Sequence, residues 1–323
     1  MNIKDKHIYS HYLKYLSPPD ITGIVFLFIL SLIEIIYSAI IVYWYLLSAL
    51  NLILICLIVF IVRKYESKTD LENEQLNNSF SFIKLIRFWY AVLLILVCFK
   101  EVYLIIHLSH IPDIDILLIK IDHDIFGVNP TQWIYRFANP LLTEILEIVY
   151  FLYYLVIIAY GLELYLWRRF EEFKYATFII LVGFFLCYVV YMIFPAAGPR
   201  FYLHNFESIN TELPGVLVTG WLREILNVGE SIPADVPNPQ DYVQRDAMPS
   251  AHAVIAVLLA YLSHKIKSHS FYFYLPYCIL MIIATIYLRY HYVIDIIAGL
   301  LFAVITIGIC NFVYSNRTKR EYE

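Results

Sequence analysis

The run from Ile21 to Arg63 constrains the fold of this chain most strongly, because its residues are almost all apolar. A helix crosses the hydrocarbon core of a bilayer with about 20 apolar residues. The run is about twice that length. We therefore expect it to form two membrane-spanning helices, with the break between Tyr43 and Asn51.

Six further apolar runs follow along the chain, separated by polar or proline-containing segments. The chain is 61% hydrophobic and 15% charged, a balance typical of integral membrane proteins. We expect an all-α fold, a polytopic bundle of about eight transmembrane helices. The six later spans are expected at residues 85–108, 140–167, 175–194, 249–263, 271–288 and 292–313.

The polar segments suggest how the chain is divided. Residues 109–139 alternate short apolar stretches with Asp and Pro, which favours interfacial helices and turns, and residues 195–248 form a long polar excursion. We expect an N-terminal segment with two extra transmembrane helices at residues 1–84. A six-helix catalytic core at residues 85–314 and a charged cytoplasmic tail at residues 315–323 would follow.

Composition excludes several classes of function. The net charge is −4, so the chain has no overall basic field that would attract nucleic acid. The five cysteines lie inside apolar runs without CxxC spacing, which indicates buried thiols rather than disulfides or a metal site. Walker and Rossmann motifs are absent from the sequence.

The distribution of Lys and Arg predicts the orientation in the membrane. With eight spans both termini share one side, which collects 16 of these residues against 6 on the other side. Cytoplasmic loops carry the excess of Lys and Arg. We therefore expect cytoplasmic termini in a plasma or inner membrane. Arg200, His252 and His291 are then expected at the non-cytoplasmic face.

Two histidine motifs lie at the starts of the sixth and eighth spans. His291 and Asp295 are four residues apart and would share one face of a helix. Asp295 can accept the proton of one imidazole nitrogen and leave the lone pair of the other free for attack. Arg289 adds a fixed positive charge, and His252 ends the motif Pro249-Ser250-Ala251-His252.

Arg200 completes this set of residues. Gly198 and the prolines beside it end the fifth span and leave Arg200 at the membrane surface. A planar guanidinium binds two phosphate oxygens at once. The N–H groups around Ser250 would form a helix N-terminus, which binds anions, beside His252. Together these residues indicate phosphate-ester chemistry.

Each of these features also has a structural interpretation. A histidine can simply sit at the membrane interface, and a His–Asp pair on a helix can be a surface contact worth a few tenths of a kcal/mol. Asp246 can cap the sixth span. The run from Asp122 to Asp124 offers metal ligands, although neighbouring side chains on a helix diverge. Intramembrane acids such as Glu34 and Glu101 can pair within the bundle or line a headgroup cavity.

The two histidine motifs resemble a known family. Pro249-Ser250-Ala251-His252 followed by His291 and Asp295 is similar to the type-2 phosphatidic acid phosphatase (PAP2) superfamily. The stretch from Tyr290 to Gly299 looks like the branch with inositolphosphotransferases, of the inositol phosphorylceramide synthase type. The resemblance covers about residues 85–313, the expected six-helix core.

The resemblance implies a phosphohistidine mechanism that requires no metal or cofactor. His291, oriented by Asp295, would attack phosphorus. His252 would protonate the leaving oxygen and later activate water or an acceptor hydroxyl. The implied phosphate-binding residues are Arg200, Arg289 and Ser250.

The sequence departs from the phosphatase pattern at two positions. Ile193 stands where that pattern has a Lys seven residues before the first Arg. Thr285 stands where it has an Arg six residues before the nucleophilic His. Both departures fit the transferase-like branch better than a simple phosphatase.

The implied activity is hydrolysis or transfer of a phosphate group of a membrane lipid, with a lipid or polyol acceptor in the case of transfer. A transporter is one alternative, but it predicts charges spread through the bilayer and spans broken at its midplane. Here the charges collect at one interface. A non-catalytic membrane scaffold is the other alternative, and it would not need both histidines.

Overall fold

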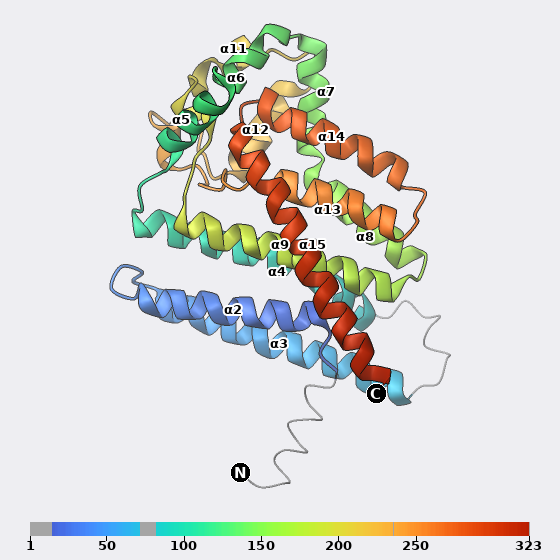
Figure 1. Ribbon diagram of the computed structural model, residues 1–323. Helices are drawn as coiled ribbons and strands as arrows, with labels where there is room; N and C mark the ends of the chain where they lie inside the picture. The colour runs from blue at the N-terminus through green and yellow to red at the C-terminus, as the bar shows by residue number, and fades with distance from the viewer. Residues whose placement is uncertain (1–14, 72–81, 235, 323) are drawn as a thin grey trace. The chain divides into compact units, whose positions relative to one another are not determined.

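A computed structural model describes residues 15–71, 82–234 and 236–322, and every regular element in these ranges is a helix. This confirms the expected all-helical bundle (Figure 1). The helices are α2 (Pro18–Ile36), α3 (Trp44–Leu71), α4 (Phe82–Ser109), α5 (Asp115–Phe126), α6 (Pro130–Trp133), η2 (Ile134–Phe137), α7 (Pro140–Phe151), α8 (Tyr153–Leu166), α9 (Phe170–Ile193), α10 (Pro199–Tyr202), η3 (Phe206–Ser208), α11 (Ile209–Glu212), α12 (Thr219–Gly229), η4 (Pro239–Asp241), α13 (Ala251–Lys265), α14 (Phe271–Tyr287) and α15 (Val293–Tyr322).

Each expected span coincides with apolar helix, but not every one is a single long helix. In the described part of the chain, five helices are long and apolar enough to cross a membrane: α2, α3, α4, α9 and α15. The expected fourth span is a pair, α7 and α8, bent by 52°, which would make six. The expected sixth and seventh spans, α13 and α14, have 15 and 17 residues and are shorter than a full crossing needs.

The chain forms two compact units. Unit 1 is Met1–Ser109 with Arg169–Val182, and unit 2 is His110–Arg168 with Gly183–Glu323. The division expected from the sequence, with boundaries at residues 84 and 314, stays a prediction.

Unit 1 contains α2, α3 and α4, which pack against one another. Its apolar contacts include the fully buried side chains of Leu27 and Leu30. Asp20 and Arg87, both buried, join α2 to α4 through hydrogen bonds of 2.8 and 2.9 Å.

Unit 2 is arranged around α13, which packs against α14 and α15. Helix α7 packs against α12 and α14, and α5 packs against α15 (Figure 1). Side-chain caps start the helices locally: the Oγ of Ser250 accepts the N–H of Ala253 in α13, and the side chain of Asn139 accepts the first N–H groups of α7. The loops before α10, α13 and α15 come together and form the candidate site.

Candidate active site

Three loops that are far apart in the sequence meet beside the first turns of α13 and α15. The N–H of Ala247 donates to the carbonyl of Ala196 at 3.0 Å, and the N–H of Ser250 donates to the carbonyl of Asp295 at 3.1 Å. The expected convergence of the His252 and His291 motifs with the Arg200 loop is therefore present in the backbone itself.

Gly198 allows the closest approach between two of these loops. Its φ is +99°, and a Cβ atom there would lie 2.6 Å from the carbonyl oxygen of Tyr290. Real Cβ atoms do not come so close to backbone, so any other residue would push the Arg200 loop away from the His291 loop.

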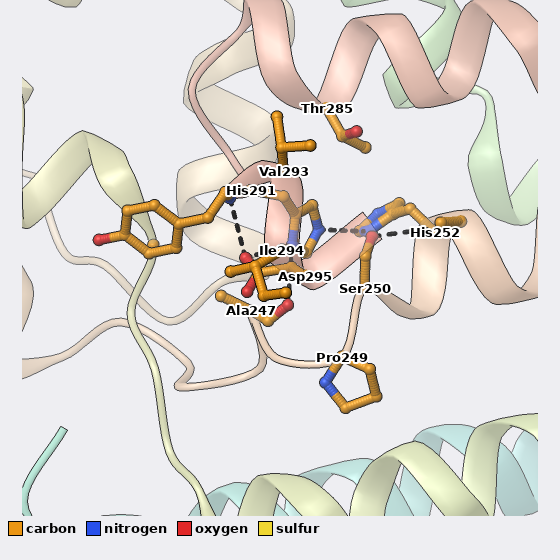
Figure 2. A network of polar contacts seen from close by, with 12 residues as sticks. Ala247, Pro249, Ser250, His252, Thr285, His291, Val293, Ile294 and Asp295 are labelled. Atoms are coloured by element: carbon orange, nitrogen blue, oxygen red, sulfur yellow. Dashed lines mark hydrogen bonds and ion pairs between the residues drawn. The ribbon is translucent and has the colours of Figure 1, made fainter. Parts of the chain in front are cut away.

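The two histidines are in direct contact, with Nδ1 of His252 3.2 Å from Nε2 of His291 (Figure 2). The Nδ1 of His291 lies 2.9 Å from the backbone carbonyl of Ala247. A carbonyl can only accept, so Nδ1 of His291 carries the proton and Nε2 carries the lone pair. The proton in the contact between the two rings then belongs to His252.

Asp295 does not form the expected hydrogen bond to the imidazole of His291. Its Oδ2 accepts the N–H of Tyr292 at 2.9 Å and lies 3.6 Å from Nδ1 of His291, too far for a hydrogen bond. The expected hydrogen bond between His291 and Asp295 is therefore replaced by the one to Ala247. Asp295 is fully buried, and its carboxyl group lies close to the ring.

Burial sets the protonation state of His291. The side chain is 4% exposed, and burial lowers the pKa of the imidazole from 6.5 to about 4. The charge of Asp246 and the hydrogen bond to the Ala247 carbonyl oppose this decrease in pKa. His291 is therefore neutral at physiological pH, with the lone pair available.

Aromatic rings connect the histidine pair to Arg200. His252 stacks on Tyr150 with ring centroids 4.5 Å apart, and Tyr150 stacks on Tyr290 at 4.0 Å. The guanidinium of Arg200 lies 4.5 Å from the centroid of the Tyr290 ring. Burial lowers the pKa of Arg200, although the side chain stays a cation because a guanidinium is almost never deprotonated. Tyr153 contacts the His252 ring as well, at 4.3 Å.

Both candidate phosphate-binding arginines are paired with glutamates. Arg200 forms an ion pair with Glu230 and a 3.4 Å hydrogen bond to Asn227. Arg289 forms an ion pair with Glu212, and its guanidinium lies 5.3 Å from the Tyr135 ring centroid. Arg289 therefore points its guanidinium to Glu212 and not to the histidine pair, in contrast to the expected convergence.

Ser250 is a helix cap in this structure. It is fully buried, its Oγ accepts the N–H of Ala253 at 3.3 Å, and its own N–H donates to Asp295. The hydroxyl of Ser250 is thus engaged by the chain, and its expected phosphate contact stays a prediction.

Comparison with known proteins assigns the chain to a family. Residues 116–309, more than half of the chain, match the PAP2 superfamily. The chain belongs to the PAP2 superfamily. It is also similar to a PA-phosphatase related-family protein of Dictyostelium discoideum, with 28% identity over 185 residues. That match covers 51% of this chain and 31% of the relative, and no solved structure matches.

Two aspartates of α5 hold the loops of the candidate site, a role that the sequence analysis did not assign to them. Asp115 accepts the N–H groups of Ala197 and Gly198 and the hydroxyl of Tyr292. Asp122 accepts the N–H groups at the start of α15, from residues 293 and 294, at 2.8 Å each. Burial raises the pKa of both carboxyls, and these N–H donors oppose that increase.

The arrangement of α5 also bears on the metal alternative. Asp122 faces α15, whereas His123 and Asp124 are exposed. Within the described ranges, no group of three or more His, Cys, Asp or Glu side chains is arranged to hold a metal ion. The side chains of Asp122, His123 and Asp124 therefore do not converge on one point in this structure.

A cavity of about 360 Å³ lies beside the site of this PAP2 protein. Arg200 and Tyr290 are among the residues that line it, together with the polar side chains of Asn210, Arg223 and Asn227. The cavity is large enough for a polar headgroup. It extends to the ring of Tyr290, which stacks on Tyr150, and Tyr150 in turn stacks on His252.

Proposed function

We propose that this chain is a membrane enzyme that cleaves or transfers a phosphate ester group of a lipid through a phosphohistidine intermediate. The observation that carries the proposal is the contact between His252 and His291, with Nδ1 of His291 on the carbonyl of Ala247. This tautomer directs a lone pair on Nε2 toward the second histidine. A phosphoryl group can reach this lone pair when the contact between the two rings opens.

In the first step, Nε2 of His291 bonds to phosphorus while the bond from phosphorus to the leaving oxygen breaks. His252 enters this step as an imidazolium, because the negatively charged phosphate ester beside it favours the cation, and it gives its Nδ1 proton to that oxygen. The imidazole of His291 keeps its Nδ1 proton and becomes cationic. The buried carboxylate of Asp295, 3.6 Å away, offsets this developing charge.

In the second step, a hydroxyl attacks the phosphoryl group and the bond from His291 to phosphorus breaks. His252, now neutral and without its Nδ1 proton, takes the proton of the attacking hydroxyl. Water gives hydrolysis, and an alcohol gives transfer. Arg200 exchanges its glutamate partner for phosphoryl oxygens, and Arg289 turns its side chain from Glu212 toward the histidine pair to do the same. Both stabilise the charge that develops there.

The cavity favours transfer as the second candidate activity, in line with the inositolphosphotransferase-type branch. Its asparagine and arginine side chains can hydrogen-bond the hydroxyls of a polyol acceptor or headgroup. The apolar helices would hold the acyl chains of the lipid, with the site on the non-cytoplasmic side.

Incubation of the purified protein with radiolabelled lipid phosphates, with and without polyol or lipid alcohols, tests the proposal. We expect an acid-labile phosphoenzyme and release of phosphate, or a new phosphate monoester of the acceptor alcohol when the acceptor is present. We also expect both products to form in excess EDTA, because the arginines provide the charge stabilisation that a metal would otherwise supply. Absence of a phosphoenzyme with every lipid phosphate would refute the phosphohistidine route.

A further inference from the structure

Glu34 and Glu101 of unit 1 are two buried carboxyl groups that take no part in the proposed reaction and have no ion-pair partner among the described residues. Glu34 on α2 is fully buried, and Glu101 on α4 is 3% exposed. Glu101 lies eight residues before the end of α4 at Ser109, about 12 Å along the helix axis. Neither carboxyl forms an ion pair with a Lys or Arg of the described chain.

The side chain of Asn51 on α3 joins these two acids. Its Nδ2 donates to Oε1 of Glu34 at 3.4 Å, and the Glu101 carboxyl lies within electrostatic reach of Glu34 and Asn51 without a hydrogen bond of good geometry to either. Ser48 also donates to Glu34, at 2.7 Å. The cluster therefore takes one or two polar side chains from each of three packed helices, α2, α3 and α4.

Three oxygen atoms of this cluster are left without a donor. Both carboxyl oxygens of Glu101 and Oδ1 of Asn51 are buried and have no hydrogen-bond partner among the residues that the structure describes. Asn51 is itself fully buried. All three atoms are acceptors, so what the cluster lacks is positive charge or a proton.

A third buried carboxyl group of the same unit, that of Asp20, shows what full compensation looks like. Asp20 is equally buried, and it receives two hydrogen bonds from Arg87, one from Tyr90 and one from the hydroxyl of Ser17. An ionised carboxylate in an apolar bundle is very unfavourable unless it is paired in this way. Two unpaired carboxylates close together would also repel each other.

We propose that Glu34, Asn51 and Glu101 form a binding site for one monovalent cation, H⁺ or Na⁺, inside unit 1. A proton on Glu101 supplies the missing donor to Oδ1 of Asn51 or to Glu34. A sodium ion would instead be held by the oxygens of the two carboxyls, of Asn51 and of Ser48. The site is separate from the histidine pair, and its existence does not depend on the proposed phosphotransfer.

Few other titratable groups face this site. Glu34 comes from α2, and the buried thiol of Cys98 comes from α4 itself, where the charge of Glu101 acts on it. Among the described side chains of α3, the hydrogen bonds to these glutamates come from the uncharged Ser48 and Asn51. The pH response of the cluster therefore belongs to the two glutamates.

Infrared spectroscopy and thermal unfolding of the full-length protein in detergent micelles test the site. In sodium-free buffer the wild type should show the C=O stretch of a protonated carboxylic acid at neutral pH, and Glu101→Gln should lack it. Folding then requires uptake of a proton, so stability should decrease as pH rises. The unfolding equilibrium constant should change about tenfold per pH unit for one proton.

Glu101→Gln resembles the protonated acid in shape and charge. It should therefore fold and lose this part of the pH dependence. Glu171→Gln is the matched control, because Glu171 lies in the same unit but is 76% exposed. This control should keep the wild-type infrared band and pH response.

Replacing the sodium-free salt by NaCl at equal ionic strength distinguishes the two occupants. Recovery of stability at high pH, with loss of the acid band, supports Na⁺. An unchanged pH response supports H⁺ alone. The proposal is overturned if the wild type has no acid band beyond that of Glu101→Gln and both unfold with the same dependence on pH and Na⁺. If Glu101→Gln does not fold, the wild-type band and its response to NaCl decide the question.

Discussion

At the scale of single residues, the backbone carbonyl of Ala247 decides which nitrogen of His291 can attack. This separates the roles of the two histidines, because His291 carries the lone pair and His252 carries the proton between them. The roles can be distinguished with substrates whose leaving groups need protonation to different degrees.

The variant His252→Ala should lose about 10²–10⁴-fold in rate on an alkyl lipid phosphate, because its proton donor is gone. On a nitrophenyl phosphate ester the loss should be smaller, because nitrophenolate leaves without protonation. His291→Ala should be inactive on both substrates. The measurement is the rate of phosphoenzyme formation. If His291→Ala still formed an acid-labile phosphoenzyme while His252→Ala did not, the assigned roles would be exchanged.

The pKa of His291, lowered to about 4 by burial, predicts the pH dependence of attack. In His252→Ala with the nitrophenyl ester, phosphoenzyme formation should fall only as pH approaches 4, and not at the usual 6.5. Between pH 6.5 and about 4 the unfolded chain binds a proton at this residue and the folded chain does not. The stability of the folded state should therefore decrease as the pH is lowered from 6.5 to about 4. An acid limb centred at 6.5 would contradict the buried neutral ring.

The sequence was informative about residues with distinctive side chains and uninformative about backbone partners. His252 and His291 were expected to meet, and they are in contact. Ala247 could not be singled out because its contribution is a carbonyl group, which every residue has. Asp295 was assigned the hydrogen bond that this carbonyl makes, since helical spacing says which side chains share a face but not which atom lies nearer.

At the scale of elements, the short helix α5 holds two of the three loops of the site. Asp115 binds the loop before α10, and Asp122 caps the start of α15. The sequence predicted short interfacial helices in this region. It could not reveal that Asp122 meets residues 171 and 172 positions later, because such a contact leaves no periodic pattern.

Removing the cap at Asp122 should weaken α15 and move His291. We expect Asp122→Ala to lose about 1–2 kcal/mol of stability, since two N–H groups lose a charged acceptor. Phosphoenzyme formation should slow as well. Asp124→Ala, an exposed acid on the same helix, is the matched control. Thermal unfolding and single-turnover assays measure both effects, and equal behaviour of the two variants would argue against a positioning role.

At the scale of the whole molecule, the number of full-length crossings differs from the expected eight because three spans are bent or short. The bend between α7 and α8 and the short helices α13 and α14 could not be derived from hydropathy, which measures apolar content and not helix breaks. The orientation in the membrane therefore needs a direct test.

Cysteine labelling in intact cells provides this test. In a background that lacks the exposed Cys56, Thr211→Cys should react with an impermeant thiol reagent without permeabilisation. Glu171→Cys, on the side richer in Lys and Arg, should react only after permeabilisation. The reverse pattern would put the histidine pair in the cytoplasm.

The glutamate partners of Arg200 and Arg289 have a consequence for substrate selection under the proposed function. Glu230 and Glu212 are tethered to the chain and compete with any incoming phosphate for the guanidinium groups. A free phosphate in dilute solution meets this competition at its bulk concentration. A lipid confined to the bilayer arrives at a far higher effective concentration, since it is already held in the layer that surrounds the helices. The internal glutamates thereby discriminate against soluble phosphates without any contact to the lipid chains.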